Sequence, residues 1–215
     1  MSIRIEHWSD IDSDAQDAIF KRPALKDDDA IRSATAAILA RVRTDGDNAL
    51  RALTAEYDGV QIDNIRVEPE EFTEATASLG VEAIAAIDVS IENVRRFHEA
   101  QRPASVSVET TAGVLCERIS HPLDSVGLYV PAGTAPLPSA AVMLAVPAAI
   151  AGCPTRVLCT PPRSDGSADP AVLVAAQRAG IHEVFKIGGA QAIGAMAYPF
   201  FWSFGQTRGT SCSSG

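Results

Sequence analysis

The sequence predicts an α/β fold in which a helical amino-terminal portion precedes a truncated, Rossmann-like parallel sheet. Three short runs rich in β-branched residues, 126–130, 155–159 and 184–187, alternate with runs of small residues that favour helices. Parallel strands need long crossover connections, so this alternation is typical of a parallel sheet covered by helices. Right-handed crossovers are expected to place the three strands side by side.

Two helices are expected at the start of the chain. Apolar residues recur at helical spacing after the acidic run 27–29, and Gly46 closes this first helix. Residues 48–57 repeat the pattern, and the Asp58-Gly59 pair gives the turn that ends the second helix. The two segments therefore predict a helical hairpin.

Two more helices and a β-hairpin are expected before the sheet. Pro69 lies where a helix begins, and residues 81–101 form the longest helix. One face of that helix carries Ile84, Ile87, Ile91, Val94 and His98. We interpret this face as a surface that packs against the core, because apolar stripes at this spacing are usually buried. Residues 105–120 alternate polar and apolar side chains around Gly113, which predicts a hairpin.

The α/β portion is expected to carry three helices, one after each strand. They span residues 138–151, 170–179 and 190–197, and Pro147 is expected to kink the first of them. The Rossmann fingerprint GxGxxG is absent. In its place, loops 131–138 and 188–191 combine small residues with a helix start, where a pyrophosphate or a polar ring would fit.

Composition and charge narrow the classes of function. The chain has 215 residues, 47% of them apolar, and a formal net charge of −9. Its few basic residues are scattered, which argues against nucleic acid as a partner and favours a small molecule. The first residues lack the apolar run of a signal peptide, and no run approaches the roughly 20 apolar residues of a membrane helix. We therefore expect a cytoplasmic protein without a membrane partner.

The cysteines and histidines predict neither disulfides nor a metal site. The four cysteines form no CxxC pair, and the four histidines show no HxxH or HExxH spacing. Cys116 and Cys153 raise the alternative of a thiol that captures an aldehyde. We interpret both as small buried apolar residues.

Several motifs, in order and at matching spacing, resemble the histidinol dehydrogenase family. They are RPAL at 22–25, GDNAL at 46–50, YDGV at 57–60, FHEAQ at 97–101, and the block from GLYVP at 127–131 to GGAQAI at 188–193. The resemblance covers about residues 20–198. Members of that family are about twice as long as this chain, which therefore resembles an amino-terminal half.

The resemblance implies an NAD-dependent, zinc-containing, homodimeric oxidoreductase that oxidises histidinol to histidine in two steps. It implies that Tyr129, in GLYVP, and Gln191, in GGAQAI, contact NAD. The family's third NAD contact, its catalytic bases and its zinc ligands belong to the other half, so it implies no catalytic or metal-binding residue here. Without the family, a strand-end Tyr and a helix-cap Gln would have structural roles about equally often.

We divide the chain into residues 1–125, a helical and α+β portion; 126–198, a partial NAD-binding domain; and 199–215, an aberrant tail. The tail is rich in Phe and Trp, without acidic residues or periodicity, which suggests a frameshift or artificial gene end after Tyr198. Truncation predicts an inactive, aggregation-prone chain with exposed apolar surface and an unpaired edge strand. The alternatives are a non-catalytic dinucleotide-binding or dimerisation fragment, or a relative that oxidises another small hydroxylated compound.

Overall fold

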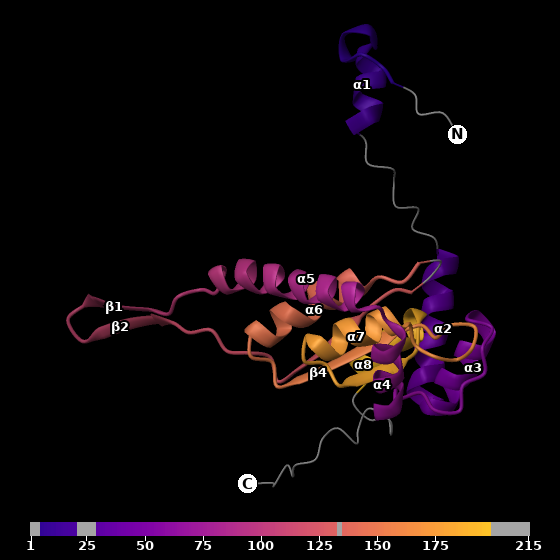
Figure 1. Ribbon diagram of the computed structural model, residues 1–215. Coiled ribbons are helices and arrows are strands. Elements are labelled where there is room, and N and C mark those ends of the chain that lie inside the picture. Colours follow the sequence, from indigo (N-terminus) through magenta and orange to yellow (C-terminus); the bar gives the residue numbers. More distant parts are fainter. Residues whose placement is uncertain (1–4, 21–28, 133–134, 199–215) are drawn as a thin grey trace. The chain divides into compact units, whose positions relative to one another are not determined.

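A computed structural model describes residues 5–20, 29–132 and 135–198 (Figure 1). The described residues up to Ala37 and those from Ile38 onward form two compact units. The first unit contains a 3-10 helix, η1 (Trp8–Asp10), and helix α1 (Ser13–Phe20), neither of which the sequence analysis predicted. Asp12 supplies the signal that was missed, because its carboxylate accepts a hydrogen bond from the Ala15 N–H and caps α1.

The four helices predicted ahead of the sheet are all present. They are α2 (Asp29–Asp45), α3 (Asp47–Tyr57), α4 (Pro69–Ser78) and α5 (Val81–Ala100). Gly46 separates the first two with a positive φ of 55°, which favours glycine. Pro69 begins α4, where Glu68 and Glu71 form a capping box. The predicted apolar face of α5 packs on the core, with Ile91 buried.

The predicted hairpin is present and exposed throughout. Strand β1 (Val106–Thr111) pairs antiparallel with β2 (Val114–Arg118), and Gly113 forms the turn with a φ of 83°. Every residue of both strands is exposed. A two-stranded hairpin gains little stability by itself, so these strands add little to the core of the protein.

The predicted parallel sheet is confirmed, with its strands in sequential order. Strands β3 (Ser125–Tyr129), β4 (Thr155–Thr160) and β5 (Glu183–Lys186) lie in the order β3-β4-β5. The register aligns Tyr129 with Cys159 and Cys159 with Phe185. One helix follows each strand, namely α6 (Pro138–Ile150), α7 (Pro170–Arg178) and α8 (Gly189–Ala197). Pro147 lies inside α6.

Helices cover both faces of this small sheet. On one face, Leu128, Leu158 and Val184 pack with α4, α5, α6 and α7. On the other face, Cys159 and Phe185 pack with α2, α3 and α8. Figure 1 shows α5 lying along α6, and close contacts between the two helices accompany that arrangement. The sheet is therefore the middle layer of three, as expected for parallel strands.

The expectation of an unpaired edge is wrong for β5. The Val67 N–H donates to the Val184 carbonyl oxygen at 2.9 Å, and the Lys186 N–H donates to the Ile65 carbonyl oxygen at 2.7 Å. The segment between α3 and α4 thus runs antiparallel to β5 and takes up its outer hydrogen-bonding groups. Among the described residues, no strand pairs with the outer side of β3. Apolar surface also remains on α6, where Met143 is 63% exposed.

Some of the predicted features lie outside the described residues. They are the RPAL motif at 22–25, the first two residues of the acidic run 27–29, Gly133 and Thr134 of the first small-residue loop, and the tail 199–215. Within the described part of the chain, every helix is too short or too polar to cross a membrane.

Candidate functional site

The two residues predicted to contact a cofactor meet at one turn. Tyr129 ends β3, Gly188 lies between β5 and α8, and Gly189 is the first residue of α8. The Gly189 N–H donates a hydrogen bond to the Tyr129 hydroxyl oxygen over 3.0 Å. Both groups lie at the carboxyl ends of parallel strands, where open α/β sheets bind their ligands.

The backbone of this turn requires glycine at both positions. A Cβ atom on Gly188 would lie 2.8 Å from Cγ of Pro161, closer than carbon atoms approach in proteins. Gly189 has a φ of 62°, in the left-handed region that favours glycine, and a Cβ there would lie 2.7 Å from Oε1 of Gln191. The small residues therefore let other side chains approach the main chain.

Gln191 is almost completely buried beside the turn. The residue is only 2% exposed, and its amide makes no hydrogen bond to any residue that the structure describes. Buried amides usually have protein or water partners, so an amide without a protein partner needs an explanation, and a bound ligand is one. Gln191 thus presents a donor and an acceptor beside Gly189.

The start of α8 differs from the start of α7. At α7, the Asp169 carboxylate accepts hydrogen bonds from the Ala171 and Val172 N–H groups and so caps the helix. At α8, the N-cap residue is Gly188, which has no side chain, and the Gly189 N–H is taken by Tyr129 from another strand. The start of α7 is therefore capped by the residue before it, whereas the first N–H group of α8 is paired with a side chain that is distant in the sequence.

Asp58 is a third polar residue at the turn, and the sequence analysis missed it. Its Oδ1 atom lies 3.4 Å from the position of a Cβ on Gly188, and its Oδ2 atom is buried. The carboxylate makes no hydrogen bond or ion pair with the described residues, and burial raises its pKa above the usual value. Asp58 belongs to the YDGV motif, which by its sequence alone indicates only a turn at the end of a helix.

A second polar cluster occupies the other face of the sheet at the end of β5. Lys186 is 8% exposed, and its Nζ atom donates to both carboxylate oxygens of Glu71 at 2.9 and 3.0 Å. The same Glu71 carboxylate accepts the Glu68 N–H at 3.0 Å. Every charged group of this cluster is paired, so its role is to join α4 to the sheet.

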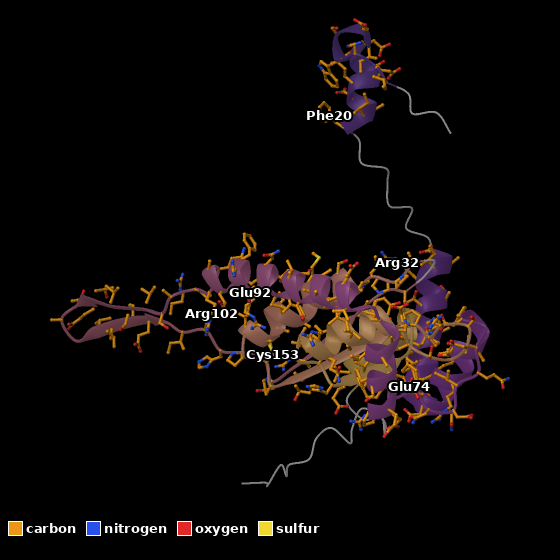
Figure 2. The ribbon with its side chains drawn as sticks, viewed as in Figure 1. Phe20, Arg32, Glu74, Glu92, Arg102 and Cys153 are labelled. Carbon is orange, nitrogen blue, oxygen red and sulfur yellow. The ribbon has the colours of Figure 1, made fainter. Side chains whose placement is uncertain are left out.

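The cysteines are less uniform than predicted. The interpretation of Cys116 as buried is wrong, because it lies on the exposed strand β2. Cys153, which follows α6 (Figure 2), is buried as predicted. Cys159 is also buried, which raises its pKa far above the usual value and leaves the thiol unreactive.

The histidines do not assemble a metal site with neighbouring acids or thiols. In residues 5–20, 29–132 and 135–198, no three His, Cys, Asp or Glu side chains form a group able to hold a metal ion.

The polar turn and the three-layer fold can be compared with known proteins. The family model described as histidinol dehydrogenase matches residues 21–201. The chain belongs to the histidinol dehydrogenase family. A histidinol dehydrogenase of Xanthomonas axonopodis pv. citri is 51% identical over 196 residues, which are 91% of this chain and 46% of the relative.

More distant histidinol dehydrogenases give the same result. The enzyme of Vibrio parahaemolyticus is 45% identical over 89% of this chain and 43% of its own length. The crystal structure of histidinol dehydrogenase from Elizabethkingia anophelis superposes with a TM-score of 0.81 at 36% identity, over 86% of this chain and 43% of that one. The chain therefore spans less than half the length of these relatives.

Proposed function

We propose that this chain is the NAD-binding half of a histidinol dehydrogenase. It would hold the dinucleotide at the Gly188-Gly189 turn through Tyr129 and Gln191. The remainder of a family-length protein would supply the catalytic bases, the zinc ligands and the third NAD contact. On its own, this chain would bind NAD without oxidising histidinol.

The convergence of Tyr129 and Gln191 carries this proposal. Tyr129 ends strand β3 and Gln191 lies on helix α8, and the Tyr129 hydroxyl and the Gln191 amide both lie against Gly189. Residues that serve the core separately have no reason to meet at a backbone turn. A ligand that is flat and polar, such as a nicotinamide or adenine nucleoside, gives them one.

The described residues fit a dinucleotide and do not fit zinc. The Gln191 amide and the Tyr129 hydroxyl, both beside Gly189, offer hydrogen-bonding groups of the kind that a sugar or base needs. The described His, Cys, Asp and Glu residues form no metal-binding group, so no zinc-dependent step is assigned to them. When bound, NAD would supply the hydride acceptor, and this chain would bind and orient it.

Isothermal calorimetry on the purified chain tests the proposal. We expect saturable NAD binding that Gln191→Ala and Tyr129→Ala each abolish, and no NADH formation when histidinol is added. Gln177→Ala is the matched control, because Gln177 lies on α7, away from the turn. No NAD binding by a chain that circular dichroism shows to be folded would reject the proposal.

The substrate and the assembly are further parts of the proposal. Histidinol is the substrate named by the relatives, and another small hydroxylated compound is the alternative. The resemblance also supports a homodimer in the cytoplasm. Mixing the chain with the separately expressed remainder of a relative tests this scheme, since histidinol-dependent NADH formation is expected only from the mixture.

A further inference from the structure

Asp58 lies in a position that the fold itself does not favour. It follows the last turn of α3, where its N–H donates to the Thr54 carbonyl oxygen at 2.9 Å. A negative charge is unfavourable there, because the carboxyl end of a helix carries partial negative charge. Its Oδ2 atom is buried without a hydrogen-bond partner in the described part of the chain. Local preferences are commonly violated in this way at functional sites.

The neighbours of Asp58 are those of the candidate site. Its carboxylate lies against Gly188. The Gly189 N–H donates to the Tyr129 hydroxyl, and the side-chain amide of Gln191, a residue that is almost completely buried, lies against Gly189. The turn is thus lined by a carboxylate, a hydroxyl and an amide. These groups come from α3, β3 and α8, and only the third belongs to the turn's own helix.

Two features disfavour a phosphate group at this turn. One N–H group at the start of α8, that of Gly189, is already bonded to Tyr129. The Asp58 carboxylate beside Gly188 would also repel a phosphate, although helix starts generally attract such groups. A carboxylate instead accepts hydrogen bonds from hydroxyl or amino groups. The turn therefore suits an uncharged part of a dinucleotide.

We propose that Asp58 is a third NAD-binding residue, which accepts hydrogen bonds from a ribose hydroxyl or an amino group and keeps the pyrophosphate away from the start of α8. This inference rests on the proposed function and specifies which part of NAD the turn holds. Asp58 is not part of the sheet: it follows helix α3, which packs on one face of the sheet.

Calorimetric titration of NAD into the Asp58→Asn variant tests the inference. Asn keeps the size of the side chain and removes its charge, so we expect binding about tenfold weaker. If the turn instead held the pyrophosphate, removing the negative charge would tighten binding. Unchanged or tighter binding would therefore overturn the inference.

Stability and a matched variant separate a binding role from a structural one. Because the carboxylate is desolvated and unpaired, the melting temperature of Asp58→Asn should equal or exceed that of the wild type. A lower melting temperature would indicate a structural role and overturn the inference.

Asp63→Asn is the matched control, because it removes an exposed charge from the same loop and should leave NAD binding unchanged. Failure of the folded wild-type chain to bind NAD would reject the proposed function as well, whereas NAD binding that Asp58→Asn does not weaken would reject this inference alone.

Discussion

Two polar clusters lie at the carboxyl end of β5, on opposite faces of the sheet, and they differ in how well they are satisfied. Lys186 and Glu71 form a nearly buried ion pair that also takes part in the capping box of α4. On the other face, the side chains of Asp58 and Gln191 make no hydrogen bond to a described residue, and the Oδ2 atom of Asp58 is buried. The hydrogen-bonding groups of the first cluster are paired with one another, whereas those of the second are the groups that the proposed function assigns to a ligand.

Under the proposed function, this difference separates polar residues that stabilise the fold from polar residues that recognise a ligand. Burying a polar group without a partner costs free energy, so a fold keeps such a group only where another requirement outweighs the cost. Substitutions in the first cluster should therefore reduce stability and spare binding. Substitutions of Asp58 or Gln191 should weaken binding and leave stability largely unchanged.

The largest expected effect on stability comes from Glu71→Gln. This substitution keeps the capping hydrogen bond but leaves the Lys186 charge buried without its counter-ion. We expect the free energy of unfolding to fall by about 2 kcal/mol in urea titrations. Glu74→Gln, on the exposed side of α4, should have almost no effect. Equal losses for the two variants would contradict the structural role of the first cluster.

Gly189→Ala should affect both stability and binding. The positive φ and the 2.7 Å approach to Oε1 of Gln191 together predict a loss of about 1.5 kcal/mol. NAD binding should be lost as well, because Gln191 must move. Thermal unfolding and calorimetry measure the two effects, and Gly80→Ala, where a Cβ meets open space, is the control. A stable variant that still binds NAD would show that the turn is not constrained.

A smaller loss is expected for Tyr129→Phe, which removes only the hydroxyl. The Gly189 N–H loses its partner at the exposed turn, at a cost of about 1 kcal/mol. NAD affinity should fall further than stability does if the hydroxyl also orients the ligand. Parallel urea and calorimetric titrations would measure both, and an unchanged affinity would limit Tyr129 to a structural role.

The smallest effect is expected at an exposed ion pair, which serves as a reference for both clusters. Arg178 on α7 donates to both carboxylate oxygens of Asp88 on α5 and lowers the pKa of that carboxyl. Its stabilisation is therefore present above the ordinary Asp pKa and lost as the pH falls through the lowered value. Asp88→Asn should cost at most roughly 0.5 kcal/mol at pH 7 and nothing in strong acid. Urea titrations at both pH values check this, and a loss that persists in acid would exclude the charge as its cause.

Much of the fold could be predicted because its signals are local. The alternation of apolar runs located β3, β4 and β5, and residues such as Gly46 and Pro69 marked helix ends. The pairing of residues 65–67 with β5 was missed because this segment is held extended by its hydrogen bonds to the outer edge of β5, and its own sequence does not indicate a strand. Cys116 was predicted to be buried because cysteine is usually a small buried apolar residue, but among the described residues nothing covers either face of its strand.

The candidate site was predictable only in part, for the same reason. Tyr129 and Gln191 were identified by their motifs, and the structure then showed that they lie at one turn. Asp58 was missed because its sequence neighbours, Tyr57 and Gly59, indicate only the end of a helix. Its significance comes from Gly188, which lies far away in the sequence, and from the burial of an unpaired oxygen atom.

The most direct test of the central claim is a nuclear magnetic resonance titration of the Gln191 side-chain amide with NAD, its signal assigned by comparison with Gln191→Ala. If the unpartnered groups on the α8 face of the sheet are the groups that recognise a ligand, the Gln191 amide signals should shift in a saturable way while signals from the Lys186 region stay in place. Saturable NAD binding that leaves the Gln191 signals unmoved would contradict the account.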